Sequence, residues 1–137
     1  MASVTVKRTI AVQVIVTEDF KKELRQELQE AADATQRRIE QMDVQSRRFL
    51  ADLQRTDLTQ AMAARRQIEA ERRRHEALKQ DILRQIEETD KLDLGSEYPR
   101  GTLEGFVEVT VGDDLIKKIS GSEIVIKDGV IVEIREA

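Results

Sequence analysis

The sequence of 137 residues has no cysteine, no tryptophan, one proline and only 3% aromatic residues. The absence of cysteine excludes disulfides, thiolate metal sites and a cysteine nucleophile, so the chain needs no oxidising compartment. Nowhere do about 18 apolar residues run together, which excludes a transmembrane helix. The first eight residues also lack the apolar run of a signal peptide. We therefore expect a soluble cytoplasmic protein that has no membrane partner.

Charged residues, by contrast, are abundant, at 36% of the chain, with a formal net charge of -4. Charge at this density with so few aromatics is typical of long solvated helices rather than of a compact enzyme core. The negative total gives no global basic field that would draw the protein to nucleic acid or anionic lipid.

Apolar residues alternate with polar ones at both ends of the chain, which predicts strands. From Val4 to Val16 the even positions are apolar except for Arg8, and residues 103–111 alternate again. Residues 124–134 form two apolar runs around Asp128-Gly129, a pair that favours a type I′ hairpin turn.

The other features of the C-terminal part are two breaks between the expected strands. Pro99 and Gly101 predict a loop. Asp114 is expected to begin a short helical turn over residues 115–119.

The middle of the chain has the apolar spacing of a coiled coil. Thr17 is suited to cap a first helix, and residues 55–59 contain weak helix formers that predict a hairpin turn. Gly95 is expected to end the second helix after Leu94. Each helix is expected to carry one narrow apolar stripe, which we call its seam. The first seam is predicted to contain Leu24, Leu28, Ala31, Thr35, Ile39, Met42, Phe49 and Leu53. The second is predicted to contain Ala61, Ala64, Ile68, His75, Leu78, Ile82, Ile86, Thr89 and Leu92. One continuous helix pairing with another chain remains the alternative, because no glycine or proline enforces the turn.

These patterns predict an α+β fold, in which a long antiparallel helical hairpin is inserted into a small four-stranded antiparallel sheet or partial barrel. Residues 1–16 would form the first strand, residues 17–94 the hairpin, and residues 95–137 three strands and one short helical turn. Because the sheet would bury only a small core, a homo-oligomer is an open alternative.

No constellation of residues predicts catalysis, a metal site or a cofactor. His75, the only histidine, falls on the second seam, where we expect a hydrogen bond across the hairpin rather than a role as ligand or base. Asp113 and Asp114 could hold a divalent cation, but a helix cap explains them more simply. The scattered glycines form no phosphate-binding loop. We therefore predict a protein that is not an enzyme.

Charge is unevenly distributed along the predicted hairpin. Residues 37–84, its distal half, contain twelve bases and eight acids, whereas residues 17–36 and 85–94 contain ten acids and four bases. Arginine suits the bidentate binding of phosphate or carboxylate. The candidate anion or RNA contacts are Arg37, Arg48 and Arg55 on one helix face, Arg65, Arg72 and Lys79 on another, and Arg73 and Arg74.

Two hypotheses follow for the partner. The distal half could contact ribosomal RNA or an acidic protein, or the helical arms could clamp another polypeptide as a chaperone-like protein does. Against both stands the simpler alternative of a solvated helical surface with salt bridges between the arms.

Four short stretches stand out along the chain: Val4-Thr5-Val6, Leu94-Gly95-Ser96-Glu97, Val109 to Asp114, and Gly121 to Gly129. In these stretches the chain resembles the YlqD family of small bacterial proteins. The resemblance extends from end to end, although its specific motifs lie in the last 45 residues or so. The resemblance implies a protein of the bacterial cytosol, in a family without known catalytic residues. It also implies a link to ribosome maturation and tRNA modification, because relatives are often encoded beside genes for those functions.

Overall fold

The structure, a computed structural model, describes residues 2–136. It divides into two compact units. The β unit contains the chain up to Lys21 and from Leu92 onward, and the helical unit contains Lys22–Lys91.

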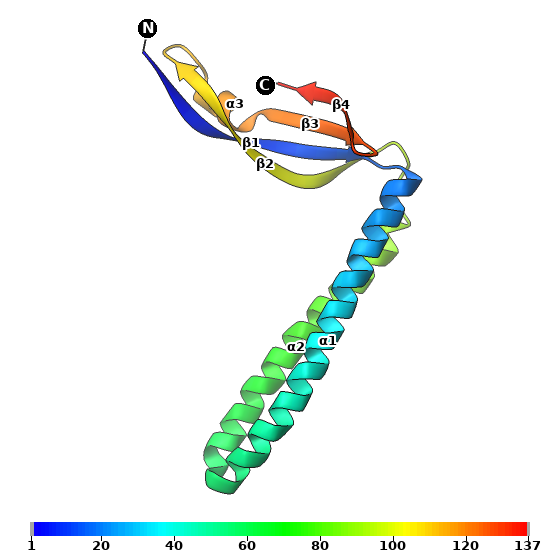
Figure 1. Cartoon of the computed structure of the whole chain (residues 1–137), viewed down its shortest axis with the longest axis vertical. Helices are drawn as coiled ribbons and strands as arrows, with labels where there is room; N and C mark the ends of the chain where they lie inside the picture. Colours follow the sequence, from blue (N-terminus) through cyan, green and yellow to red (C-terminus); the bar gives the residue numbers. More distant parts are fainter. Residues whose placement is uncertain (1, 137) are drawn as a thin grey trace. The chain divides into compact units, whose positions relative to one another are not determined.

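The β unit is built on one four-stranded sheet in the order β2-β1-β3-β4, shown in Figure 1. Its strands are β1 (Ser3–Ile15), β2 (Glu97–Thr110), β3 (Ser122–Lys127) and β4 (Val130–Arg135), and a short helix, α3 (Leu115–Ser120), connects β2 to β3.

The sheet is mixed, so the prediction of a fully antiparallel sheet was wrong. β1 pairs antiparallel with β2, and β3 with β4, but β1 and β3 run parallel. The connection explains this direction. β2 ends beside Ser3 at the start of β1, and β3 begins beside Ile10 on the other edge of β1. From Ile10 onward β3 runs beside the second half of β1 and in the same direction, up to the pair of Ile126 with Val14.

β2 is longer than the sequence pattern predicts. Pro99 and Gly101, which were expected in a loop, lie within the strand at a register shift opposite Val12 and Gln13. An edge strand tolerates proline, because one side of its backbone has no ladder to complete.

The last predicted boundary also differs. Helix α2 ends at Thr89 with Asp90 as its C-cap, so Gly95 does not cap it. Gly95 instead has a positive φ of 85° and donates its N–H to the carbonyl of Val16 (2.8 Å), while the Val16 N–H donates to Ser96 (2.8 Å). Glycine is suited to this position, since residues with a Cβ rarely adopt positive φ.

The turn between β3 and β4 has the predicted type I′ geometry. Asp128 and Gly129 have φ values of 47° and 83°, which confirms the prediction, since that turn needs positive φ at both central residues. The Thr17 hydroxyl donates to the Asp128 carboxylate (2.7 Å), so this turn is bonded to the start of α1.

Two long helices, α1 (Glu18–Thr56) and α2 (Leu58–Thr89), lie side by side in Figure 1. Thr17 caps the first by accepting from the Phe20 N–H (3.1 Å), as predicted. Only Asp57 separates them, in an extended conformation (φ -153°), and its carboxylate accepts from the Gln60 N–H (3.1 Å). An N-cap side chain thus begins α2 where neither glycine nor proline breaks the chain.

The buried residues of the helical unit follow most of the predicted seam. Leu24, Ile39, Ala61, Ile82 and Thr89 are buried. Two large seam residues are not, because Phe49 and Leu78 remain 53% and 51% exposed. On α1, Ala32 is buried in place of the predicted Ala31. Neither helix, within the described residues, is apolar over a length that could cross a membrane.

Candidate functional site

The predicted anion contacts occupy both helices of the helical unit. Arg37, Arg48 and Arg55 lie on α1, and Arg65, Arg72, Arg73, Arg74 and Lys79 lie on α2. They divide into two groups according to whether the side chain contacts the opposite helix.

Arg72 and Lys79 join the two helices. Arg72 Nε lies 3.3 Å from Asp43 Oδ1, and Lys79 Nζ donates to Gln36 Oε1 (2.8 Å). The two contacts are seven residues apart on each helix, so they repeat along one flank of the pair. Arg25 and Asp90 form a further ion pair between the helices, nearer their other end. Arg72 and Lys79 therefore stabilise the helix pair and are less available to a partner.

The other six predicted contacts are exposed and form no ion pair or side-chain hydrogen bond within residues 2–136. They are Arg37, Arg48, Arg55, Arg65, Arg73 and Arg74. In the distal half the only ion pair between helices among the described residues is Arg72–Asp43. Salt bridges between the two helices therefore neutralise little of the positive charge in the distal half, so the alternative of a surface neutralised in this way is not favoured.

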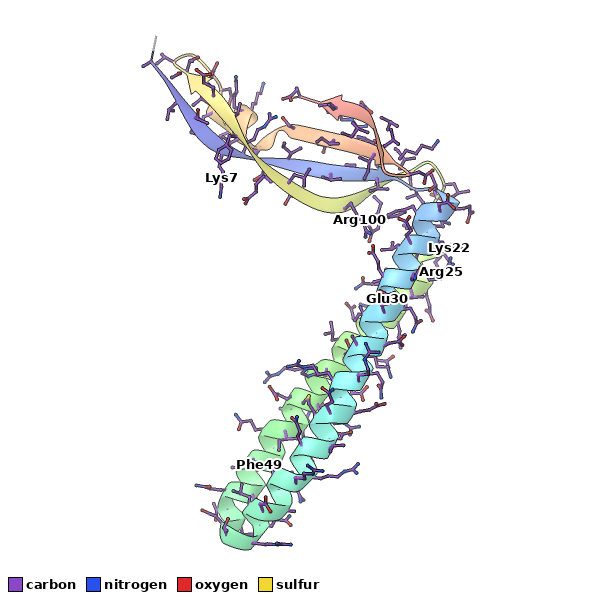
Figure 2. The ribbon with its side chains drawn as sticks, in the orientation of Figure 1. Lys7, Lys22, Arg25, Glu30, Phe49 and Arg100 are labelled. Atoms are coloured by element: carbon purple, nitrogen blue, oxygen red, sulfur yellow. The ribbon has the colours of Figure 1, made fainter. Side chains whose placement is uncertain are left out.

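Three shallow hollows mark the same half of the helical unit. One of about 380 Å³ is lined by Gln45, Ser46 and Phe49 of α1 and by Ala64, Gln67, Ile68, Glu71 and Arg74 of α2. A second, of about 390 Å³, includes Arg38 and His75. A third follows α1 between Arg37 and Arg48. Figure 2 shows Phe49 near the turn, far along the helix from Lys22 and Arg25.

His75 does not bond across to α1, so that part of the prediction was wrong. Its Nδ1 lies 2.9 Å from the carbonyl oxygen of Glu71, four residues earlier on the same helix. The ring is half-buried beside Arg38 and Leu78. This local contact with its own helix orients the imidazole.

The pair Asp113-Asp114 has structural partners. Asp114 caps α3 by accepting from the Lys117 N–H (3.2 Å), as predicted. Asp113 accepts from the Thr110 N–H (2.8 Å) and lies 3.7 Å from Lys118 Nζ. The Thr110 hydrogen bond is the main cause of the lowered pKa of Asp113. No cluster of three potential metal ligands occurs among the described residues.

One charged cluster, in the β unit, is absent from the sequence predictions. Arg135 of β4 contacts Glu97 of β2 (Nη1–Oε2, 3.0 Å), Glu123 of β3 (3.2 Å) and its neighbour Glu133 (3.1 Å). The hydrogen bond from Arg135 lowers the pKa of Glu97, and the three carboxylates raise the pKa of Arg135. Because β2 and β4 are the outermost strands, this arginine links the two edges of the sheet.

No local signal could have predicted this cluster, because three strands supply its members. Arg135 is already paired with three carboxylates of its own chain. We therefore interpret the cluster as stabilising the sheet rather than as a binding site.

Comparison with known proteins places the chain in a family. Residues 4–135 match the family described as YlqD protein. The protein "Uncharacterized protein YlqD" of Bacillus subtilis is 29% identical over 130 residues, which cover 93% of this chain and 94% of that protein.

The solved structure described as an unknown function protein from Synechococcus sp. WH 8102 has 26% sequence identity and a TM-score of 0.89. The match covers 98% of this chain and 96% of that one. Since the family match extends over nearly the whole sequence, the chain belongs to the YlqD family.

Proposed function

We propose that the distal half of the helical unit is a non-catalytic surface that binds a polyanion, structured RNA such as ribosomal RNA, in the bacterial cytoplasm. The observation that carries this proposal is the set of six exposed arginines without a partner in residues 2–136. Arginines in phosphate contacts release condensed counterions, which supplies affinity even when the net charge of the protein is negative.

The spacing of the helix contacts supports a rigid scaffold for this surface. Gln36–Lys79 and Asp43–Arg72 recur after one heptad on both helices. This period is that of an antiparallel coiled coil, and we infer that α1 and α2 form one. A coiled coil would hold the arginines at fixed spacing, which reduces the ordering cost of binding.

The test compares two variants of equal net charge. In the first, Arg48, Arg65, Arg73 and Arg74 are changed to glutamine, which favours helix nearly as well as arginine. In the second, four lysines outside the distal half are changed to glutamine: Lys7, Lys22, Lys91 and Lys127. Binding to ribosomal RNA is measured from about 50 mM salt upward, because electrostatic attraction is strongest at low salt.

We expect only the arginine variant to lose affinity. The slope of log affinity against log salt should flatten by about one for each phosphate contact removed. Equal losses in both variants would show that net charge alone governs binding. Absence of RNA binding by the unaltered protein at about 50 mM salt would refute the proposal.

Exposed apolar side chains in the same half favour a second candidate, a chaperone-like clamp on another polypeptide. Val44, Phe49, Leu58, Met62 and Leu78 are each more than half exposed. Replacing Phe49 and Met62 with glutamine should then abolish suppression of aggregation of an unfolded test protein. The arginine variant should retain that activity, so the two candidates predict opposite results.

A further inference from the structure

The helical unit has a single aromatic ring of the Phe, Tyr or Trp type, that of Phe49. It belongs to the predicted seam, yet its side chain is 53% exposed, whereas large apolar side chains are usually buried. The ring lines the hollow of about 380 Å³, to which α2 adds the apolar side chains Ala64 and Ile68. We call this feature the Phe49 hollow. Its apolar part is open to a ligand.

Polar side chains surround this apolar surface. They are Gln45 and Ser46 of α1 and Gln67, Glu71 and Arg74 of α2. Within residues 2–136 none of these side chains forms a hydrogen bond or an ion pair. Elsewhere on the same helices glutamines do pair with a residue four positions away, as in Gln29–Asp33 and Gln85–Asp81. The hydrogen-bonding groups around the Phe49 hollow are therefore available to a ligand.

This arrangement fits a flat ligand that has an apolar face and a polar edge. A nucleobase has both, because its face stacks on aromatic side chains and its edge donates and accepts hydrogen bonds. Gln45 and Gln67 each offer a donor and an acceptor, and the Glu71 carboxylate offers acceptors. An apolar side chain of a polypeptide would cover these polar groups without pairing them, which costs free energy. The Phe49 hollow thus favours a base over an apolar peptide side chain.

The Phe49 hollow also adjoins the arginines that the proposed function assigns to phosphate. Arg74 lines it directly. Gln45 lines both this hollow and the one along α1 that includes Arg37 and Arg48, so the two hollows share a side chain. Because a nucleotide carries its phosphate next to its base, a base in the Phe49 hollow brings phosphates toward these arginines.

We propose that the Phe49 hollow binds an unpaired nucleobase of the RNA, which stacks on the Phe49 ring while the neighbouring arginines contact the adjoining phosphates. This inference rests on the proposed RNA binding and adds a requirement to it. The RNA must offer a base in a loop, a bulge or a single strand, since a base inside a helix does not present its face to a protein.

Two RNAs test this requirement with the full chain. One is a hairpin with a single-stranded loop, and the other is a fully paired duplex with the same number of phosphates. Two matched variants are compared on both RNAs. Phe49→Leu removes the ring but keeps an apolar side chain that favours helix. Phe106→Leu makes the same change on β2, at a phenylalanine that is 71% exposed.

We expect the unaltered protein and Phe106→Leu to bind the hairpin more tightly than the duplex. Phe49→Leu should lose at least about 5-fold in affinity for the hairpin, because base–aromatic stacking is removed. It should lose nothing for the duplex. Its slope of log affinity against log salt should stay unchanged, since Phe49 contacts no phosphate. The arginine variant, by contrast, should flatten that slope.

The outcomes separate this inference from the proposed function. Equal binding of hairpin and duplex by the unaltered protein, or unchanged hairpin affinity in Phe49→Leu, would overturn the stacking and leave the arginine surface in place. Binding of neither RNA by the unaltered protein would refute both. If Phe49→Leu loses suppression of aggregation but keeps its affinity for the hairpin, the Phe49 hollow takes a polypeptide and the inference is wrong.

A fluorescent reporter detects the stacked base directly. The chain has no tryptophan, so Phe49→Trp and Phe106→Trp each introduce a single indole. A base that stacks on an indole quenches its fluorescence. The hairpin RNA should therefore quench Phe49→Trp and leave Phe106→Trp unchanged. Equal quenching of the two variants, or quenching of neither, would contradict a base bound in the Phe49 hollow.

Discussion

Replacing Ile39 with alanine removes the most deeply buried side chain of the helical unit, which is 1% exposed. Ile39 lies between Gln36 and Asp43, which contact Lys79 and Arg72 of α2. The change deletes three carbon groups, worth about 0.8 kcal/mol each in transfer free energy. The cavity left behind adds to this, so the free energy of unfolding should fall by about 3 to 4 kcal/mol.

The matched control is Leu78→Ala, which deletes the same number of carbon atoms from a seam position that is 51% exposed. Solvent already reaches this side chain, so the loss should be about 1 kcal/mol. Urea unfolding followed by circular dichroism at the helical band measures both variants. If Ile39→Ala costs no more than Leu78→Ala, the two helices do not pack around Ile39 and the helix pairing described above is wrong.

Two further predictions concern the β unit. Gly129→Val should lower its free energy of unfolding by at least about 1 kcal/mol, because φ is +83° there; an unchanged thermal midpoint would argue against the type I′ turn. Arg135→Gln should destabilise the protein more at neutral pH than in acid. Ionised Glu97 stabilises the fold above its ordinary pKa of 4.5, and this contribution is lost as the pH falls through its lowered folded pKa. The difference in unfolding free energy between the variant and the unaltered protein, measured at about pH 7 and about pH 3, should therefore shrink in acid; an equal difference at both pH values would exclude an ionic role for the cluster.

The sequence by itself determined the features that depend on neighbouring residues. Alternation predicted β1, and the caps Thr17 and Asp114 are local hydrogen bonds that the structure contains. The Asp128-Gly129 turn likewise depends on the conformational freedom of two adjacent residues. The uneven distribution of charge along the helices could also be predicted, because it depends only on which residues are charged and where they stand in the sequence.

The tertiary structure alone decided the features that join distant segments. The parallel pairing of β1 with β3 follows from where the chain crosses the sheet, and no periodicity records that path. Arg135 contacts carboxylates 38 and 12 residues away in the sequence. Arg72 and Lys79 contact side chains of α1, whereas no such contact is found for Arg73 among the described residues. Pattern shows which side of a strand is apolar. Whether another layer covers that side depends on long-range packing, which the alternation of residues along one strand does not record.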